Sequence, residues 1–476
     1  LRYDVIEDVG AYVRAPEPAT LYRMHGSLSG AYRVRNVAAR YRVVLTNTLP
    51  SGLNRGFGGP QLYLGLERTM AIAARRLGLD PAELARRNLI RASELPYRTP
   101  SGGLYDSGDH EACLDDALEL VRWGERVEEA RAARSGGRLV GVGLACVVEP
   151  SISNMGYITL AQTAVERAAT LPKSGNAEGA LVQVDPLGGV TVRLATTPQG
   201  QGHRTVVAQV VADELGCEPG DVRVLAEMDT ATVPWTVASG NYSSRFSGVA
   251  VGAVSAAARS VRAKVDAIRA RLDDPDASLR RVAGSAHWNP EGLPEGMEPG
   301  LSAVAFWSAP NLDPPDAEDR VASSAAHGLI VDACVVEVER ETGEVRVLDY
   351  VTVHDAGVLL NPLLADGQVR GGFAHGAAAA LWERHVYDEW GTQLTGTFVD
   401  YLAPAAPDVP GLRIAHRSTP SPFTALGAKG LGEGNTMSAP AALANAVADA
   451  IGRDDVELPL TAPRVWELLD AGDRAP

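Results

Sequence analysis

Cysteine is scarce in this chain. The four cysteines, Cys113, Cys146, Cys217 and Cys334, lie far apart and form no CxxC pair. They therefore supply no zinc or iron–sulfur ligand set, and isolated thiols of this kind are typical of a reducing cytoplasm. The nine histidines do not follow HxxxH or HxH spacing either. A metal bound here would have to bring most of its ligands with it.

Long apolar runs are also absent. No stretch of about 18 consecutive apolar residues occurs, which excludes a membrane-spanning helix within this sequence. The first residues show no basic segment followed by an apolar one, so no secretory signal is visible. The sequence begins with Leu1 rather than methionine, so the natural N-terminus could lie upstream.

Positive charge is in deficit. Lysine and arginine number 44 against 59 aspartates and glutamates, which gives a net charge of −15. A surface that binds duplex nucleic acid needs clustered cations, so this balance excludes a broad one and is compatible only with a local cationic pocket. With 476 residues, 45% of them hydrophobic and 22% charged, the chain is expected to form roughly two to four globular domains.

A linker rich in proline, glycine and serine between about 90 and 108 predicts a domain boundary, which divides the chain into 1–95 and 105–476. A long helix is expected over 109–133, and hairpins are expected over 180–194 and 329–351. Residues 273–322 are rich in proline, glycine and aspartate, and we expect an irregular insert there. Hairpins mixed with helices, rather than strict alternation, favour an α+β fold with mixed sheets.

Four segments share one design, in which glycines and an uncharged amide or hydroxyl precede an expected helix start. These segments are 55–61, 199–202, 239–245 and 367–372. Glutamine offers donors and acceptors together, which suits the edge of a heterocycle. Helix N-termini, with Arg55, Arg245 and Lys429, suit phosphate groups. One such loop is weak evidence, but four of them predict a large ligand with a polar ring and a phosphate tail.

A fifth segment carries a single carboxylate between glycines. It reads Gly427-Ala428-Lys429-Gly430-Leu431-Gly432-Glu433-Gly434, and a helix is expected from about Ala441 to Ile451. Its glycines allow close approach to a ligand, although a tight turn with Glu433 in water is the simpler interpretation. The spacing matches neither GxGxxG nor GxxxxGK[ST], which gives little support to a generic nucleotide-binding protein.

Together these motifs resemble the molybdopterin-binding large subunit of the molybdenum hydroxylases, which include xanthine dehydrogenase, aldehyde oxidase and aerobic carbon monoxide dehydrogenase. The resemblance rests on four motifs: Arg55-Gly56-Phe57-Gly58-Gly59-Pro60-Gln61, Gln199-Gly200-Gln201-Gly202, Asn361-Pro362 with Gly367-Gln368-Val369, and Lys429-Gly430-Leu431-Gly432-Glu433. It implies that 1–95 is the C-terminal part of a first molybdopterin-binding domain. Residues 105–476 would then form the second such domain, with the Glu433 loop in its active site.

The resemblance also implies the cofactor and the reaction. The cofactor would be molybdopterin, in bacterial relatives usually the cytosine dinucleotide, whose dithiolene sulfurs hold molybdenum without protein ligands. The reaction would be hydroxylation of an aldehyde or an N-heteroaromatic carbon with oxygen derived from water. Electrons would leave through a 2Fe–2S subunit and an FAD subunit. Because family large subunits are longer, this chain would be a fragment, or a split subunit whose N-terminal half is a separate chain.

Residue roles follow from the resemblance, position by position. Glu433 matches the family's general base, and Gln201 and Gln368 match residues that hydrogen-bond the pterin or its metal's oxo ligand. Further cofactor contacts are implied at Arg55, Gly56, Gln199, Ser243, Ser244, Arg245 and Lys429. Phe57 matches a phenylalanine that stacks on flat substrates, although a core aromatic is the alternative interpretation. Arg23 aligns loosely with an arginine that orients substrate.

The sequence also bears on the choice of substrate and on a rival function. Carbon monoxide oxidisers of the family carry a copper-binding cysteine in the loop that contains Arg55. No cysteine occurs in 54–61, which disfavours carbon monoxide as the substrate. The chain could instead be a non-catalytic scaffold or partner-binding subunit that holds no cofactor.

Overall fold

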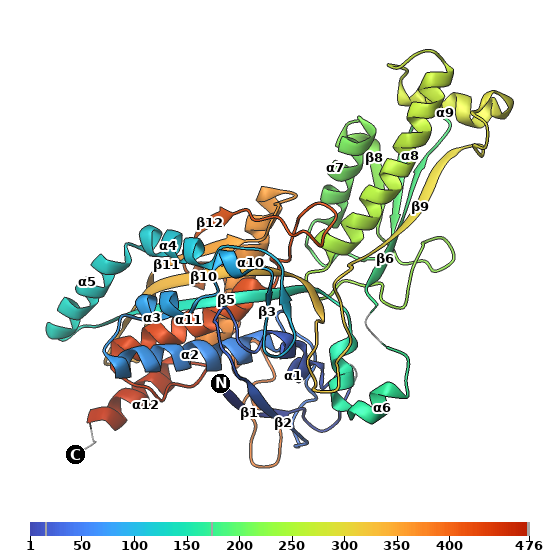
Figure 1. Cartoon of the computed structure of the whole chain (residues 1–476). Helices are drawn as coiled ribbons and strands as arrows, with labels where there is room; N and C mark the ends of the chain where they lie inside the picture. The colour runs from blue at the N-terminus through green and yellow to red at the C-terminus, as the bar shows by residue number, and fades with distance from the viewer. Residues whose placement is uncertain (15–16, 173–174, 474–476) are drawn as a thin grey trace.

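The computed structural model describes residues 1–14, 17–172 and 175–473, which form a body and a lobe that projects from it (Figure 1). The body is built on a four-stranded mixed sheet with the order β12-β11-β10-β5. Antiparallel pairs join β5 to β10 and β10 to β11, and β12 adds parallel to β11. The strand bounds are β5 Leu139–Ser153, β10 Ser324–Val338, β11 Val345–Asp355 and β12 Arg413–Arg417.

Helices cover both faces of the body sheet. One face carries α11 (Gly434–Ile451), against which α10 (Pro362–Leu381) and α2 (Gly59–Leu77) pack, while α4 (His110–Val121) and α5 (Trp123–Ser135) lie across the other (Figure 1). One hydrophobic cluster runs from Met24 in the first ninety residues to Val465 in α12 (Ala462–Asp473). The segments on either side of the expected boundary near residue 100 therefore share a core.

Close packing of α11 on β5 depends on two strand glycines, Gly141 and Gly143. A Cβ added at Gly143 would lie 2.1 Å from the carbonyl oxygen of Ala442 and 2.7 Å from the amide nitrogen of Ala446. Both neighbours are helix backbone, which cannot move aside independently. The glycines therefore set the distance between this helix and the sheet.

We expect Gly143→Ala to lower the free energy of unfolding by about 1–3 kcal/mol, because the added methyl overpacks the helix–sheet contact. Urea unfolding of the purified chain measures this change. Gly65→Ala is the matched control, since Gly65 lies in α2 with nothing within 4 Å of an added Cβ. Alanine should stabilise that site by about 0.5–1 kcal/mol. A Gly143 variant as stable as the wild type would contradict this account of the packing.

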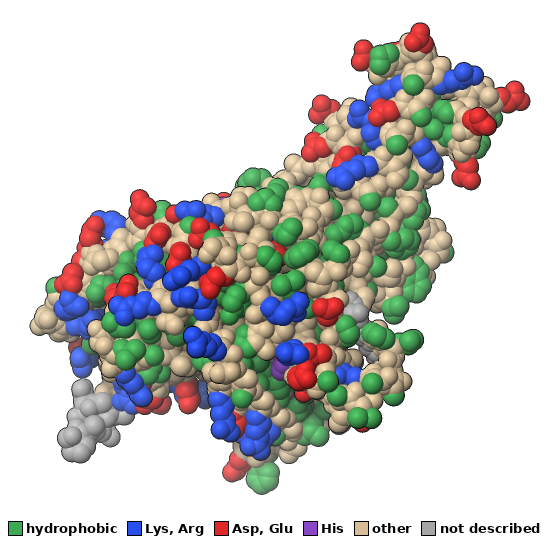
Figure 2. Space-filling model, viewed as in Figure 1, with side chains coloured by type: hydrophobic (Ala, Val, Ile, Leu, Met, Phe, Trp, Pro, Cys, Tyr) green, Lys and Arg blue, Asp and Glu red, His purple; other side chains and the backbone are tan. Residues whose placement is uncertain are grey.

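The lobe has its own four-stranded sheet, with the order β8-β7-β6-β9. Helices α7, α8 and α9 cover one face and form a second core with the strands (Figure 1). The lobe's elements are β6 Ala177–Val184, β7 Val190–Leu194, α7 His203–Leu215, β8 Val222–Leu225, α8 Val251–Arg271, α9 Leu279–Trp288 and β9 Leu301–Ser308. Figure 2 shows charged side chains on the body and at the far end of the lobe, with fewer between them.

The N-terminal elements flank the body. A two-stranded parallel sheet pairs β1 (Arg2–Asp8) with β2 (Ala38–Val44), and the short helix α1 (Ala19–Arg23) lies between them in sequence. Two further helices are α3 (Pro81–Asn88), which Asp80 caps as its spacing predicts, and α6 (Ala164–Ala168). A small hairpin pairs β3 (Tyr97–Arg98) with β4 (Leu104–Tyr105) in the expected linker. Within the described ranges, no helix is both long and apolar enough to cross a bilayer.

Hairpins mixed with helices confirm the α+β prediction, and both expected hairpins are present as β6–β7 and β10–β11. The single helix expected over 109–133 is wrong, because the chain breaks at Arg122, whose φ of 58° ends α4 and starts α5. The irregular insert expected over 273–322 is also wrong. Val282, Ala283 and Ala286 form the buried face of α9, and the alternating residues 301–308 form β9.

Two further expectations fail at glycine-rich segments. Residues 367–372 were expected to be a loop, but they lie inside α10, whose start is fixed by Pro362 and by Asn361 capping the amide of Leu364. Similarly, α11 begins at Gly434 rather than near Ala441 and accommodates Pro440. In both cases, small residues serve close packing between helices: a Cβ on Gly376 of α10 would lie 2.6 Å from the carbonyl oxygen of Asn435.

Candidate active site

A cavity of about 750 Å³ lies where the lobe meets the body. Segments far apart in the sequence line it: 53–57, 199–206, 241–247, 356–368 and 428–433. The four glycine- and amide-bearing segments therefore converge with the Glu433 loop, as the sequence predicts. Of the expected site residues, Arg55, Phe57, Gln199, Gln201, Ser243, Ser244, Gln368, Lys429 and Glu433 line the cavity.

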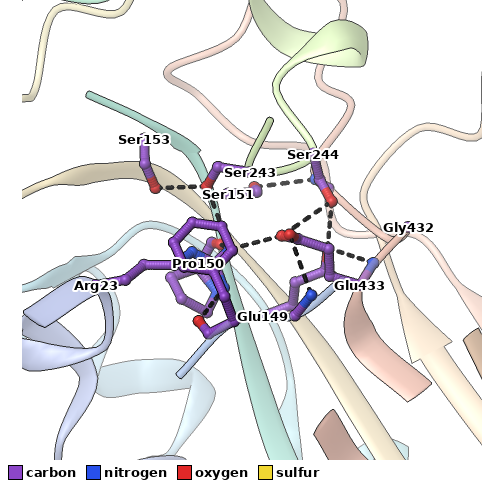
Figure 3. A network of polar contacts seen from close by, with 12 residues as sticks. Arg23, Glu149, Pro150, Ser151, Ser153, Ser243, Ser244, Gly432 and Glu433 are labelled. Atoms are coloured by element: carbon purple, nitrogen blue, oxygen red, sulfur yellow. Dashed lines mark hydrogen bonds and ion pairs between the residues drawn. The ribbon is translucent and has the colours of Figure 1, made fainter. Parts of the chain in front are cut away.

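Glu433 lies at the N-terminal end of α11, with 8% of its surface exposed. Its Oε2 accepts a hydrogen bond from Arg23 Nη2 at 2.6 Å, and its Oε1 accepts one from the amide of Gly56 at 3.3 Å. The hydroxyl of Ser244 is a third donor, 3.5 Å from Oε2 (Figure 3). The carboxylate is therefore held by partners from three segments and faces the cavity, rather than lying in bulk water.

Arg23 is buried and does not line the cavity. Besides Glu433, its guanidinium donates to the carbonyl of Pro150 at 2.9 Å and to the hydroxyl of Ser243 at 3.2 Å. It also lies 4.5 Å from the ring centre of Phe57, a cation–π contact. In this geometry Arg23 is the counter-ion of Glu433 and contacts Phe57. Its Nη2 is already engaged, and its Nε is buried without a hydrogen-bond partner among the described residues.

Arg55 joins two of the converging segments. Its Nε donates to the carbonyl of Gly432 at 2.5 Å, and its Nη2 donates to the carbonyl of Gln368 at 2.8 Å. Burial lowers the pKa of Arg55, while the charges of Glu149 and Glu433 oppose that shift. The guanidinium therefore fixes the Glu433 loop to α10.

The serine segment has a strained backbone. Ser243 and Ser244 have φ values of 53° and 46°, a left-handed region that is unfavourable for residues with a Cβ. The amide of Ile152 holds the carbonyl of Ser243, and a π-helical turn follows at Phe246–Ala250. Strain and π-turns of this kind concentrate at functional sites. Here they direct the Ser244 hydroxyl toward Glu433.

The glutamine segments present amides to the cavity. Gln201 accepts from the amide of Gln199 at 2.6 Å, and Asn241 donates to the Gln199 side chain at 3.3 Å. Between the two glutamines, Gly200 has a φ of 100° and nothing within 4 Å of an added Cβ. The backbone there is open to a bound molecule.

Two expected cofactor contacts are engaged elsewhere. Arg245 does not line the cavity, and its guanidinium contacts the carbonyl of Ala238, the hydroxyl of Tyr242 and the carboxylate of Glu178. Lys429 does line the cavity, although its Nζ donates to the carbonyl of Ser107 at 2.8 Å. Gly56 contributes its amide to Glu433.

Glu149 is a residue of this region that the sequence motifs do not reveal. Glu149 on β5 is buried and contacts both Ser244 and the amide of Glu433. A glutamate directly after the apolar run that ends at Val148 was the available signal, since a charge at the end of a buried strand needs a partner. His203 stacks on Phe246 with ring centres 3.7 Å apart, and burial lowers the pKa of His203 to about 4, which keeps it neutral.

Comparison with known proteins supplies the family. Two profiles described as "Molybdopterin cofactor-binding domain" match this chain, one over residues 116–410 and one over residues 1–89. The chain is a member of the molybdopterin cofactor-binding family. This confirms the resemblance that the motifs carry.

The relatives of the molybdopterin-binding chain include the nicotine 6-hydroxylase large subunit of Paenarthrobacter nicotinovorans, which is 32% identical over 98% of this chain and 57% of the relative. The carbon monoxide dehydrogenase large chain of Hydrogenophaga pseudoflava is 30% identical over 98% of this chain and 58% of the relative. Quinoline 2-oxidoreductase from Pseudomonas putida 86 matches with a TM-score of 0.85 and 30% identity over 99% of this chain and 60% of that one. The molybdopterin-binding chain thus spans less than two thirds of each relative.

The residues of the cavity suit a molybdopterin. Its lining offers amides and hydroxyls, together with the open backbone at Gly200, which fit a polar ring. In the part of the chain that the structure describes, no group of three or more His, Cys, Asp or Glu residues could hold a metal ion.

Proposed function

We propose that this chain forms the catalytic part of a molybdenum hydroxylase large subunit, which oxidises an aldehyde or an N-heteroaromatic carbon with oxygen from water. The observation that carries the proposal is the position of Glu433, a nearly buried carboxylate that faces the cavity where the amide-bearing segments converge. If Glu433 were an exposed carboxylate on a simple turn, it would not face the cavity in this way.

The cofactor would be held by side chains of the lobe and by the body loops. Gln199, Gln201 and Gln368 would contact the pterin, with the hydroxyls of Ser243 and Ser244 beside it. The positive charge of Arg55 and Lys429, which both line the cavity, would favour a phosphate, as in the cytosine dinucleotide form of the cofactor. When bound, the molybdopterin would supply the two-electron redox chemistry.

Glu433 would act as the general base that takes up the proton released as water-derived oxygen is transferred to the substrate. Arg23 keeps this carboxylate oriented through its 2.6 Å contact, and the amide of Gly56 fixes the other oxygen. Arg23 would also support the ring of Phe57, which lines the cavity and could contact a flat substrate there. We therefore assign Arg23 an indirect role in substrate orientation.

The substrate class follows from the cavity and the relatives. The relatives include proteins named for nicotine, quinoline and carbon monoxide. None of the residues that line the cavity is a cysteine, so the copper chemistry named for one carbon monoxide dehydrogenase has no thiol here. This favours an aldehyde or heteroaromatic substrate.

Partners would complete the enzyme. Large exposed apolar side chains gather in 43–53 and 390–402, and these segments lie against each other, since a Cβ on Gly391 would lie 2.5 Å from the carbonyl oxygen of Asn47. The exposed residues are Val43, Val44, Leu45, Leu49, Leu53, Trp390, Leu394, Phe398, Val399 and Leu402. Such a surface is typical of a protein interface. We assign it to the remaining part of the large subunit, on the same or a separate chain.

Iron–sulfur and FAD subunits would take the electrons. The relatives named as a large chain, a large subunit and a complex subunit support an assembly of this kind. The four cysteines are free thiols, which supports a cytoplasmic location.

The test is metal and nucleotide analysis of the complex, purified after co-expression with the products of neighbouring genes. We expect about one molybdenum and one CMP per chain, together with turnover of an aldehyde or an N-heterocycle. Gln201→Ala combined with Gln368→Ala should lower the molybdenum content, whereas Gln183→Ala, on an exposed strand position of the lobe, should not. A complex that holds neither molybdenum nor CMP would instead support the cofactor-free scaffold.

A further inference from the structure

The strand β5 carries a second carboxylate, Glu149, directly behind Glu433. Its side chain is fully buried and does not line the cavity. Its Oε1 accepts the hydroxyl of Ser244 at 2.7 Å and the amide of Glu433 at 3.2 Å (Figure 3). Because the Ser244 hydroxyl also lies 3.5 Å from Glu433 Oε2, one serine bridges the two carboxyl groups.

The strand pairing makes room for this arrangement. Glu149 lies opposite Gly328 on β10, and a Cβ on Gly328 would lie 2.8 Å from the carbonyl oxygen of Gly430. The Glu433 loop can therefore lie directly on the β5–β10 pair, where the hydroxyl of Ser151 accepts the amide of Gly430 at 3.0 Å. Glu149 thus contacts the loop from within the sheet.

The charged groups that face Glu149 are few. Glu433 contacts Glu149 from the loop. Two positive charges also act there: Arg23 from α1 acts on Glu149, and Arg55 from the segment before α2 interacts with both Glu149 and Glu433. The second oxygen, Oε2, is buried without a hydrogen-bond partner among the described residues. Two adjacent buried carboxyl groups rarely ionise together, because neither has water to screen it.

We propose that Glu149 is a positioning residue that works in its protonated form, as a neutral acceptor that holds the Glu433 amide and the Ser244 hydroxyl. This inference rests on the proposed function of Glu433. Burial, and then the charge of Glu433, raise the pKa of Glu149 to about 7. At a pH below this value Glu149 is neutral, and only the charge of Glu433 faces Arg23 and Arg55. Above it, a second negative charge disturbs the loop and the base that it carries.

Activity and its pH dependence separate this role from a merely structural one. We expect kcat of the loaded complex to fall on the alkaline side, as Glu149 ionises. Glu149→Gln keeps an acceptor oxygen and cannot ionise, so it should retain activity at pH 6 and lose that alkaline decline. Glu149→Ala leaves the serine hydroxyl and the Glu433 amide without their acceptor. Its kcat should be about ten- to a hundredfold lower at every pH, with little change in KM.

Unfolding of the chain gives a readout that does not depend on turnover. Because the pKa of Glu149 is raised from 4.5 to about 7 on folding, the stabilisation is complete below pH 4.5 and is lost as the pH rises through 7. Relative to Glu149→Gln, the wild-type Tm should therefore fall between pH 5 and pH 8. If the wild-type Tm does not fall in this way, Glu149 is not protonated in the folded chain, and the proposal is wrong whether or not the complex is active.

Glu67→Gln is the matched control. Glu67 is also a buried glutamate, with its pKa raised to about 8 by burial, but it contacts the hydroxyl of Tyr32 and the amide of Cys146 and does not line the cavity. Its variant should alter the pH dependence of Tm without altering that of kcat. An alkaline decline that persists unchanged in Glu149→Gln would overturn the proposal, whereas absence of molybdenum and turnover in the wild type would overturn only the proposed function.

Discussion

Replacing Glu433 by glutamine is expected to lower kcat by a factor of about 10² to 10⁴ while the complex keeps its molybdenum and CMP. The loss is that of a general base, and its size is the usual contribution of one. Glutamine has the same shape, and its carbonyl oxygen can still accept from Arg23, which donates to Glu433 Oε2 at 2.6 Å in the wild type. The amide cannot take up a proton. Steady-state turnover normalised to molybdenum content measures the effect.

The control for this variant is Glu125→Gln, which removes an exposed carboxylate on α5 that pairs with Arg122. It should leave both turnover and molybdenum content unchanged. If the Glu433 variant holds its cofactor and turns over at the wild-type rate, Glu433 is not the base. If it loses the cofactor, the carboxylate serves binding instead, and the assigned role is equally wrong.

The second large effect is expected in the core below this site. Asp332 on β10 is fully buried and accepts hydrogen bonds from the hydroxyls of Tyr350 and Ser438, each at 2.6 Å, and from the side-chain amide of Asn435 at 3.2 Å. Asp332→Ala would leave three buried donors without an acceptor. We expect the free energy of unfolding to fall by about 3–5 kcal/mol, the usual result of removing one side of a buried polar network.

Urea unfolding at constant m value measures this loss. Asp276→Ala, at an exposed position after α8, should change stability by less than about 0.5 kcal/mol. Because Asn435 lies two residues after Glu433, the Asp332 variant should also lower turnover in the fraction that remains folded. A loss below about 1 kcal/mol would show that the three donors find other partners.

The fold was predictable where local pattern decides it. Alternation and turn residues predict both hairpins, and Asp80 and Pro81 predict the start of α3. The pattern misleads where glycine serves packing rather than turning, as at Gly371 and Gly372 of α10. These glycines face the Arg55 guanidinium, which an added Cβ at Gly371 would approach to 3.1 Å. Such a requirement comes from a residue more than three hundred positions away and leaves no local signal.

The candidate site, like the fold, was predictable only in part. Motifs predict which segments reach the cavity, because a glycine-rich segment with amides suits ligand contact wherever the fold places it. They do not predict pairing between side chains. Arg23 and Glu433 are 410 positions apart, and their ion pair depends on the sheet, on α1 and on α11 together. Glu149 was missed because its partners, Ser244 and the Glu433 loop, come from two other parts of the chain.

The lobe, residues 177–308, is inserted between two strands that are themselves paired neighbours, β5 and β10. β5 ends at Ser153 and β10 begins at Ser324, and the hydroxyls of these two residues lie 2.7 Å apart. The lobe is also held to the body by packing, because Leu360 and Leu364 of the body lie against the lobe's core. The same two leucines line the cavity, so the wall of the cavity is part of the contact that joins lobe and body.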